Sequence, residues 1–260
     1  MLTNEAVQAE QSLLDMCALV VSLTGGQQLS TRFGDSFRPG FPAPSFYGRT
    51  ALRGAADAQP QDVLHTVREA DLMLVSYTQG SVPEALPALL PDAGYVPMVT
   101  QTGMLLRLEG RSFAAAPQVV RIGPDRIEAW GDVNCIAFDK PPEQPAFAAM
   151  VQCDDCFFYG YEEDGRLIGT TLLYTRNGNA GIHEVSVLPE YRRRGIGRAL
   201  VEALCAEARA RGARLLHLEG RASNSPALAL YEASGFVRDG VRPNFYRKPA
   251  EDAVLMTKTL

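Results

Sequence analysis

The sequence predicts an α/β (α+β) fold, because strands and helices follow one another through the second half of the chain. Three apolar runs are expected to form strands, and the dipeptides Asp164-Gly165 and Asn177-Gly178 mark the turns between them. An amphipathic helix is expected over 195–211, where four apolar residues fall on one helical face. The strands are 156–161, 166–174 and 181–188, and the four apolar residues are Ile196, Leu200, Ala203 and Leu204.

Boundary residues define the other elements of this half. Gly212 stands where a left-handed residue ends a helix. Ser225 followed by Pro226 predicts an N-cap, and that helix runs to Ser234 and stops at Gly235. The remaining expected elements are a helix at 125–138 and strands at 119–122, 215–220, 236–239 and 253–259.

The first half is separated from the second by a connection over 109–124. Small residues followed by Pro117 place the joint near residue 116, which predicts two parts, 1–116 and 117–260. Proline and glycine crowd residues 34–48, where we expect an extended or mobile loop. The other elements expected here are helices at 5–23, 63–70 and 83–93, the last closed by Gly94, and strands at 72–77 and 104–108.

Composition excludes several classes of protein. The chain has 260 residues, 46% hydrophobic and 21% charged, which are values of a globular protein. It holds no apolar run of membrane-spanning length, and its N-terminus lacks the basic start of a secretory signal. The net charge of -5 does not suit nucleic-acid binding. We therefore expect a cytoplasmic protein that binds neither membrane nor nucleic acid.

Five cysteines in such a compartment are expected to be reduced thiols. Cys153 and Cys156 form a C-x-x-C, but zinc would require a second pair or nearby histidines at suitable spacing. We therefore expect free thiols and no metal.

The chemically informative segment begins where a strand ends at Pro189. Arg192-Arg193-Arg194-Gly195-Ile196-Gly197-Arg198 then opens the helix. The start of a helix presents unpaired N–H groups and partial positive charge, and glycines let an anion approach the backbone closely. The arginines add charge where a pyrophosphate would lie. A solvated basic turn is the alternative interpretation, and the strand before and helix after favour an anion site.

A second motif lies downstream, where Asn224, Tyr231, Gly235 and Phe236 form N-x(6)-Y-x-x-x-G-F. With R-x-x-G-x-G upstream, the chain from about residue 118 to 260 resembles the GNAT superfamily of acyl-CoA-dependent N-acyltransferases. Residues 218–236 and the tail with Asn244, Tyr246 and Glu251 are most similar to the ribosomal-protein-alanine N-acetyltransferases.

The resemblance implies a mixed, strongly twisted sheet in which the strands at 181–188 and 214–220 splay apart around the pantetheine arm of acetyl-CoA. Backbone groups of Val185 and Val187, on either side of Ser186, would pair with the thioester carbonyl and the pantetheine amide. Backbone N–H groups of the loop and first helical turn would hold the pyrophosphate, and Asn224 would contact the arm. The residues that would supply these N–H groups are Arg193, Arg194, Gly195, Ile196, Gly197 and Arg198, and Arg192 is also expected to bind the cofactor.

The resemblance also assigns the chemistry. Tyr231 would be the general acid near the sulfur, and Glu219, twelve residues before it, would be the general base. A carboxylate can take the proton that a primary amine loses as it attacks, and strand N–H groups can form an oxyanion site. Glu184 is the alternative base. Its neighbour His183 is expected on the opposite strand face, as a pocket or surface residue.

The first half resembles a degenerate GNAT-like partner through residues 83–108 and has no R-x-x-G-x-G, so we expect it to be non-catalytic. It carries 11 acidic residues against 7 arginines, and an acidic wall facing the cleft would attract cationic amines. The expected activity is acetyl transfer to a primary amine, either a peptide N-terminus or a small molecule. The alternative is a catalytically inactive CoA-binding sensor or scaffold. The acceptor, acyl-chain preference and oligomeric state stay open.

Overall fold

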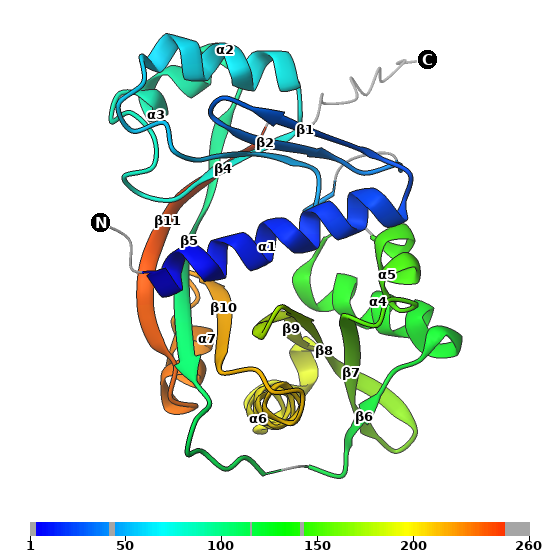
Figure 1. Cartoon of the computed structure of the whole chain (residues 1–260). Coiled ribbons are helices and arrows are strands. Elements are labelled where there is room, and N and C mark those ends of the chain that lie inside the picture. The colour runs from blue at the N-terminus through cyan, green and yellow to red at the C-terminus, as the bar shows by residue number, and fades with distance from the viewer. Residues whose placement is uncertain (1–3, 42–44, 115, 141–142, 248–260) are drawn as a thin grey trace, which may run out of the picture.

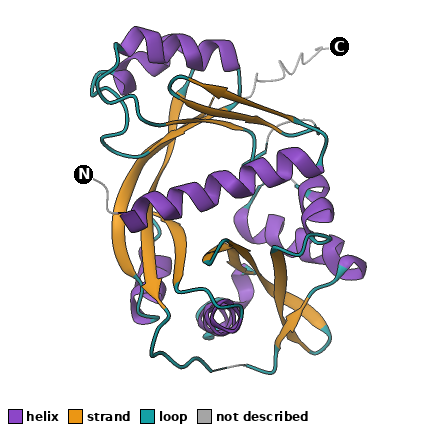
Figure 2. Ribbon diagram, viewed as in Figure 1, coloured by secondary structure: helices purple, strands orange, loops and turns teal. Residues whose placement is uncertain are grey.

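A single mixed sheet runs through the computed structural model, which describes residues 4–41, 45–114, 116–140 and 143–247. Its strand order is β1-β2-β3-β4-β11-β5-β10-β9-β8-β7-β6 (Figures 1 and 2). β3 pairs parallel with β4 and β9 pairs parallel with β10, while the other neighbouring strands pair antiparallel. The strands are β1 (Gln27–Thr31), β2 (Gly34–Arg38), β3 (Arg49–Leu52), β4 (Leu74–Tyr77), β5 (Val96–Arg107), β6 (Val119–Arg121), β7 (Cys156–Glu163), β8 (Arg166–Arg176), β9 (Asn179–Val187), β10 (Leu215–Arg221) and β11 (Val237–Arg247).

Helices cover the sheet, which confirms the expected fold class. α1 crosses the middle of the molecule from β5 and β11 to α5, while α6 packs on β8 and β9 (Figure 1). None of the described helices is long and apolar enough to cross a membrane. The α-helices are α1 (Asn4–Leu23), α2 (Pro60–Ala70), α3 (Leu86–Leu89), α4 (Ile127–Phe138), α5 (Gln144–Met150), α6 (Ile196–Ala210) and α7 (Ser225–Ala233), and the short 3₁₀ helices are η1 (Leu90–Ala93), η2 (Pro124–Arg126) and η3 (Pro189–Tyr191).

Local sequence signals account for the hairpins of the second half. Asp164 and Gly165 both have positive φ, 49° and 75°, and Asn177 and Gly178 repeat the pattern at 52° and 77°. Two successive residues with positive φ make the turn whose twist matches that of the flanking strands. Gly212, with φ 79°, follows α6 as expected. The hairpins β7–β8 and β8–β9 are therefore confirmed.

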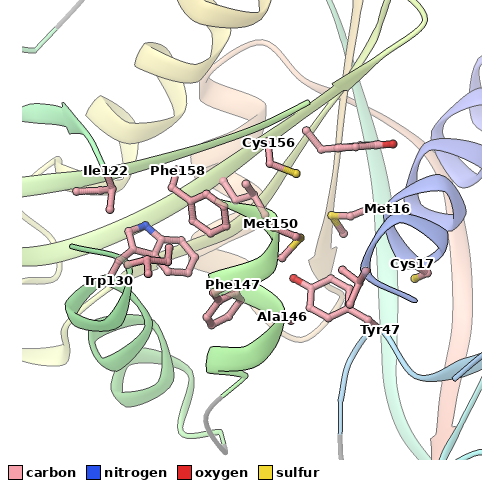
Figure 3. Packing of buried hydrophobic residues seen from close by; sticks show 14 of the residues in the cluster. Met16, Cys17, Tyr47, Ile122, Trp130, Ala146, Phe147, Met150, Cys156 and Phe158 are labelled. Carbon is pink, nitrogen blue, oxygen red and sulfur yellow. The ribbon is translucent and has the colours of Figure 1, made fainter. Parts of the chain in front are cut away.

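The sheet and the core both cross the joint near residue 116. β5, from the first half, lies between β10 and β11 of the second half and pairs antiparallel with each. Figure 3 shows Met16, Cys17 and Tyr47 packed in one cluster with Trp130 and Phe147. Neither the sheet nor this core is divided at residue 116. The division into two domains, 1–116 and 117–260, stays a prediction.

Some expected boundaries were wrong. Residues 34–38 form β2 rather than a loop, because Gly34 permits a close approach between strands: a Cβ there would lie 2.0 Å from the carbonyl oxygen of Ala51. The N-cap of α7 is Asn224 rather than Ser225, since its side chain accepts a hydrogen bond from the Ala227 N–H at 3.2 Å. The strand expected at 253–259 lies outside the described residues.

Other elements were missed or too short in the expectation. α5 and the strands β1 and β3 were missed, and β5 begins at Val96 rather than near residue 104. The helix expected over 83–93 divides into α3 and η1 and ends at Gly94, which has φ 80°. These segments are short or lack a clear period, so their pairing and packing partners decide their conformation.

Candidate active site

The site begins where two parallel strands separate. β9 and β10 pair from Asn179 with Leu215 to Ile182 with Leu218, and beyond these residues no further pair forms between the two strands, all of whose residues are described. The β8–β9 register shifts between Thr170 and Leu172, so β9 carries a bulge there. Glu184 in that bulge has φ 56°, a left-handed conformation that is uncommon for a residue with a side chain. The expected splay of the two strands is confirmed.

A cavity of about 950 Å³ occupies the gap. Its lining brings together residues from β9, β10, the loop before α6, and the helices α6 and α7. Most of the expected site residues are in that lining, although whether they bind or catalyse stays a prediction. They are Val185, Ser186, Val187, Arg192, Arg193, Gly195, Ile196, Gly197, Arg198, Glu219, Asn224 and Tyr231.

Two glycines open the start of α6 for different reasons. Gly195 is the N-cap and has φ 82°, and a Cβ there would meet nothing within 4 Å. Gly197 lies against α7, so that its Cβ would be 3.1 Å from Cδ2 of Leu230. The first N–H groups of an α-helix have no partner within the helix. Because both glycines line the cavity, these N–H groups offer an anion site at one end of it.

The arginine side chains of this segment differ in their hydrogen-bond and ion-pair partners. Arg194 is outside the cavity lining and pairs with both oxygens of Glu163, at 3.1 and 2.6 Å. Arg192 donates to two backbone carbonyls, at 3.0 and 2.9 Å, and holds the loop against β9 and α4. Arg198 pairs with Glu202 at 2.7 Å. Among the described arginines of this segment, Arg193 alone makes no hydrogen bond or ion pair, so its charge has no partner within the described part of the protein.

Tyr231 is buried on α7 at the edge of the cavity, with 6% of its surface exposed. Burial raises the pKa of its hydroxyl to about 12, so it keeps its proton at neutral pH. Gly220 on β10 makes room for it: a Cβ there would lie 3.4 Å from the Tyr231 ring and 2.9 Å from Leu228. The geometry suits a proton donor held close to β10.

Two carboxylates line the same cavity. Glu219 lies on β10 and Glu184 lies in the bulge of β9. The Oε2 atom of Glu184 lies 2.9 Å from Lys140 Nζ, and only 10% of the Glu184 side chain is exposed. Lys140 also lies 3.1 Å from Glu143 Oε2. Sequence patterns did not indicate a role for Lys140 or Glu143, because Glu184 and the loop at Ser45 and Phe46, which they contact, are distant along the chain.

His183 and Gln101 line the cavity, and each holds one buried polar atom without a hydrogen-bond partner among the described residues. These atoms are His183 Nε2 and Gln101 Oε1. Burial lowers the pKa of His183 to about 4, so the ring is neutral at pH 7. His183 and Glu184 were expected on opposite faces, yet both line the cavity, because the bulge interrupts the alternation of the strand.

The first half supplies part of the wall. Its contributions to the lining are Leu13 on α1, Phe46 in the loop before β3, and Gln101 on β5. The expectation of an acidic wall was wrong, because none of these three described residues is acidic. All five cysteines are free, as expected.

Fold and cavity together define an α/β protein with the architecture of an acyltransferase. The family model for the acetyltransferase (GNAT) family matches residues 127–236. A [ribosomal protein bS18]-alanine N-acetyltransferase of Escherichia coli is 38% identical over 96 residues, 36% of this chain and 65% of that enzyme. An uncharacterized protein of Mycobacterium leprae is 30% identical over 186 residues, 68% of this chain and 51% of that protein. The chain thus spans about half to two thirds of the length of these relatives.

The chain belongs to the GNAT family of N-acetyltransferases. The likeness to ribosomal-protein-alanine N-acetyltransferases is confirmed by the relatives that carry this name. The solved structure of a GCN5-related N-acetyltransferase from Kribbella flavida has a TM-score of 0.65 and 16% identity, over 92% of this chain and 96% of that one. That likeness shows the fold, and it extends over both halves of the chain.

Proposed function

We propose that the protein transfers an acetyl group from acetyl-CoA directly to a primary amine, with the cavity between β9 and β10 as the active site. One observation carries this proposal: a single cavity is lined by the open helix start, the end of β9 that no longer pairs with β10, a buried tyrosine and a carboxylate. The pyrophosphate would lie on the N–H groups at Gly195–Arg198, beside Arg193. The thioester would lie against Val185 and Val187, where β9 no longer pairs with β10.

The transfer step uses two proton carriers on opposite sides of the reacting atoms. The amine nitrogen forms a bond with the thioester carbonyl carbon, and the carbon–sulfur bond breaks. Glu219 takes the proton lost by the amine, and Tyr231 gives a proton to the leaving thiolate. The backbone N–H groups of β9 stabilise the oxyanion, because they are fixed before the reaction begins. Tyr231 suits its role since burial raises its pKa to about 12 and keeps it protonated.

We prefer Glu219 to Glu184 as the base because of where each carboxylate lies. An oxygen of Glu184 accepts from Lys140 at 2.9 Å, so this carboxylate is bound within the protein. Glu219 lies on β10 beside Gly220, one residue from the contact with the Tyr231 ring. Successive strand residues point to opposite faces, so Glu219 would meet an amine between β9 and β10 from the side opposite Tyr231.

The acceptor would enter at the end walled by Leu13 and Phe46. Gln101 and His183 line this cavity, and among the described residues Gln101 Oε1 and His183 Nε2 have no hydrogen-bond partner, whereas buried polar atoms in proteins are normally hydrogen-bonded. We propose that the acceptor supplies the donors. The name of the Escherichia coli relative supports a peptide α-amine, and a small-molecule amine suits the same chemistry. Residues 1–116 would then form a non-catalytic half that shapes this pocket.

Thiol release from acetyl-CoA tests the proposal directly. The acceptors are a short peptide with N-terminal alanine, the same peptide with a blocked α-amine and a lysine side chain, and a set of small-molecule amines. Release that requires one of these amines, with the acetylated product seen by mass spectrometry, supports an enzyme. Tight CoA binding without transfer to any amine favours the sensor or scaffold.

A matched pair of variants tests where the pyrophosphate binds. Gly195→Asp places a negative charge in the cradle, while Gly212→Asp places one at the other end of α6. Both glycines are left-handed, at 82° and 79°, and neither Cβ would meet another atom within 4 Å. Calorimetry should show loss of CoA binding in Gly195→Asp alone. Wild-type affinity in that variant would refute this placement.

A further inference from the structure

A buried group of charges lies at the acceptor end of the cavity, outside the residues assigned to the reaction. Lys140 Nζ is 2.9 Å from Glu184 Oε2 and 3.1 Å from Glu143 Oε2. The side chains of Lys140, Glu184 and Glu143 are 22%, 10% and 4% exposed. One ammonium is thus shared by two carboxylates that water hardly reaches. Its removal would leave two like charges close together with little screening.

Glu143 links Lys140 to the first half of the chain through hydrogen bonds. Its Oε1 accepts from Ser45 Oγ at 2.9 Å and from the Phe46 N–H at 2.7 Å. Phe46 lines the cavity and Ser45 is buried. One oxygen of Glu143 therefore holds the loop before β3, and the other oxygen holds Lys140.

Glu184 carries the connection into β9. Its left-handed φ of 56° is a strained conformation that persists where the surroundings hold it. The Glu184 carbonyl accepts from Asn134 Nδ2 at 3.4 Å and from Thr170 Oγ1 at 3.3 Å, and its carboxylate accepts from Lys140. The next residue is Val185, whose backbone faces the proposed thioester. Side chains from α4 and β8, together with Lys140, therefore fix the bulge.

Lys140 stays a cation in this setting. Burial by itself lowers the pKa of its ammonium, but the carboxylates of Glu184 and Glu143 outweigh burial and raise the pKa above its ordinary value. The charge is therefore present throughout the physiological pH range. A cation is the group that two buried carboxylates require if both are to remain ionised.

We propose that Lys140 is a positioning residue: held between Glu143 and Glu184, it fixes the loop that carries Phe46 relative to the bulge that precedes Val185. Through this side chain, the loop at Phe46 in the first half of the chain helps to set the geometry of the catalytic strand. The kinetic part of this inference rests on the proposed function, since Val185 affects catalysis only if a thioester lies against it.

Hydrogen–deuterium exchange of the full chain tests the positioning without any need for turnover. Lys140→Met removes the ammonium, and Lys140→Arg restores a cation. Arg126→Met is the matched control, because it breaks an ion pair of 2.8 Å with Glu162 away from the cavity lining. Faster exchange in 45–47 and 183–187 is expected for Lys140→Met alone. Exchange at the wild-type rate in these two segments would overturn the proposal.

Steady-state kinetics with acetyl-CoA and an amine that the wild type acetylates test whether Lys140 affects the rate of transfer. For Lys140→Met we expect kcat to fall about tenfold or more while KM for acetyl-CoA stays within about twofold, because a small misplacement of catalytic groups costs rate rather than binding. Lys140→Arg should recover most of the rate.

The outcomes separate the two proposals. An equal loss of rate in Arg126→Met, or a full loss in both Lys140 variants together with weaker acetyl-CoA binding, would show a general structural role and overturn the positioning role. A wild-type chain that acetylates no amine would overturn the proposed function. In that case the exchange experiment still decides whether Lys140 fixes the loop and the bulge.

Discussion

Gly197 on α6 and Leu230 on α7 lie so close together that a Cβ on residue 197 would be 3.1 Å from Cδ2 of Leu230. Gly195, two residues earlier, has open space around its Cα but a φ of 82°. The two glycines of one motif thus meet different constraints. Close packing of α6 against α7 requires glycine at position 197, and the left-handed N-cap of α6 requires glycine at position 195.

These constraints predict different effects of the same substitution. Gly195→Ala should destabilise the fold by about 1–2 kcal/mol through its left-handed backbone. In Gly197→Ala, a gain of about 1 kcal/mol in helix propensity should offset the displacement of Leu230, so that stability changes little. Because Leu230 lines the cavity, its displacement should weaken acetyl-CoA binding.

Urea denaturation and calorimetry measure the two quantities separately. If Gly197→Ala bound acetyl-CoA as tightly as the wild type, the contact between α6 and α7 would have no part in shaping the cofactor end of the cavity.

Tyr231→Phe removes the proposed proton donor and keeps the ring that packs against Gly220 and Phe236. We expect kcat to fall by about 10²-fold or more, the usual scale of general acid catalysis, with unchanged affinity for acetyl-CoA. Tyr174→Phe is the control, since Tyr174 is also buried but is not in the cavity lining. A Tyr231→Phe variant with the wild-type rate would remove Tyr231 from the reaction.

The second half of the chain could be predicted well because its signals are local. Asp164-Gly165 defines a hairpin within two residues, and the period of 196–204 defines a helix within three turns. The motifs around Gly195 and Tyr231 carried the family resemblance, and several of their residues, among them Gly195, Asn224 and Tyr231, line one cavity. Each of these signals lies within a short segment, so no distant pairing was needed to interpret it.

The rest of the site depends on contacts between distant segments. Gln101 enters the cavity because β5 is inserted between β10 and β11, and no local pattern predicts that pairing. Glu143 is one residue before α5, which was itself missed. The bulge at Glu184 breaks the alternation on which the placement of His183 depended. Strand order and bulges are set by the whole sheet, so they were not evident from the sequence.

The two carboxylates of the cavity can be separated by their effects on rate. Glu219→Gln should lower kcat by about 10²-fold or more at neutral pH, because an amide cannot accept the proton of the attacking amine. Part of this loss should be recovered at higher pH, where more of the acceptor amine is already neutral. Glu184→Gln should cost less, about tenfold, because it weakens the positioning contact with Lys140.

Values of kcat for both variants, measured from pH 7 to 9.5 with the same amine, decide which of the two carboxylates is the base. If kcat fell further in Glu184→Gln than in Glu219→Gln and recovered at high pH in Glu184→Gln, then Glu184 would be the base and Glu219 would not.

The buried imidazole of His183 should make the stability of the fold depend on pH. Burial is the largest cause that lowers its pKa to about 4, with Glu184 opposing and Arg49 reinforcing the shift, whereas an unfolded histidine titrates near 6.5. Between these values the unfolded chain binds the proton and the folded chain does not, so stability falls as pH falls from 6.5 towards 4. From pH 7.5 to 5 the loss from this one group should be about 2 kcal/mol.

His183→Gln should therefore lose less stability than the wild type over that interval, measured as the change in free energy of unfolding in urea at the two pH values. Carboxylates that titrate in the same range contribute equally to both proteins and cancel in the comparison. His65→Gln, at an exposed position on α2, is the control and should behave as the wild type. Equal acid sensitivity of the wild type and His183→Gln would mean that the ring is hydrated or protonated in the folded protein, and that it presents no neutral Nε2 to an acceptor.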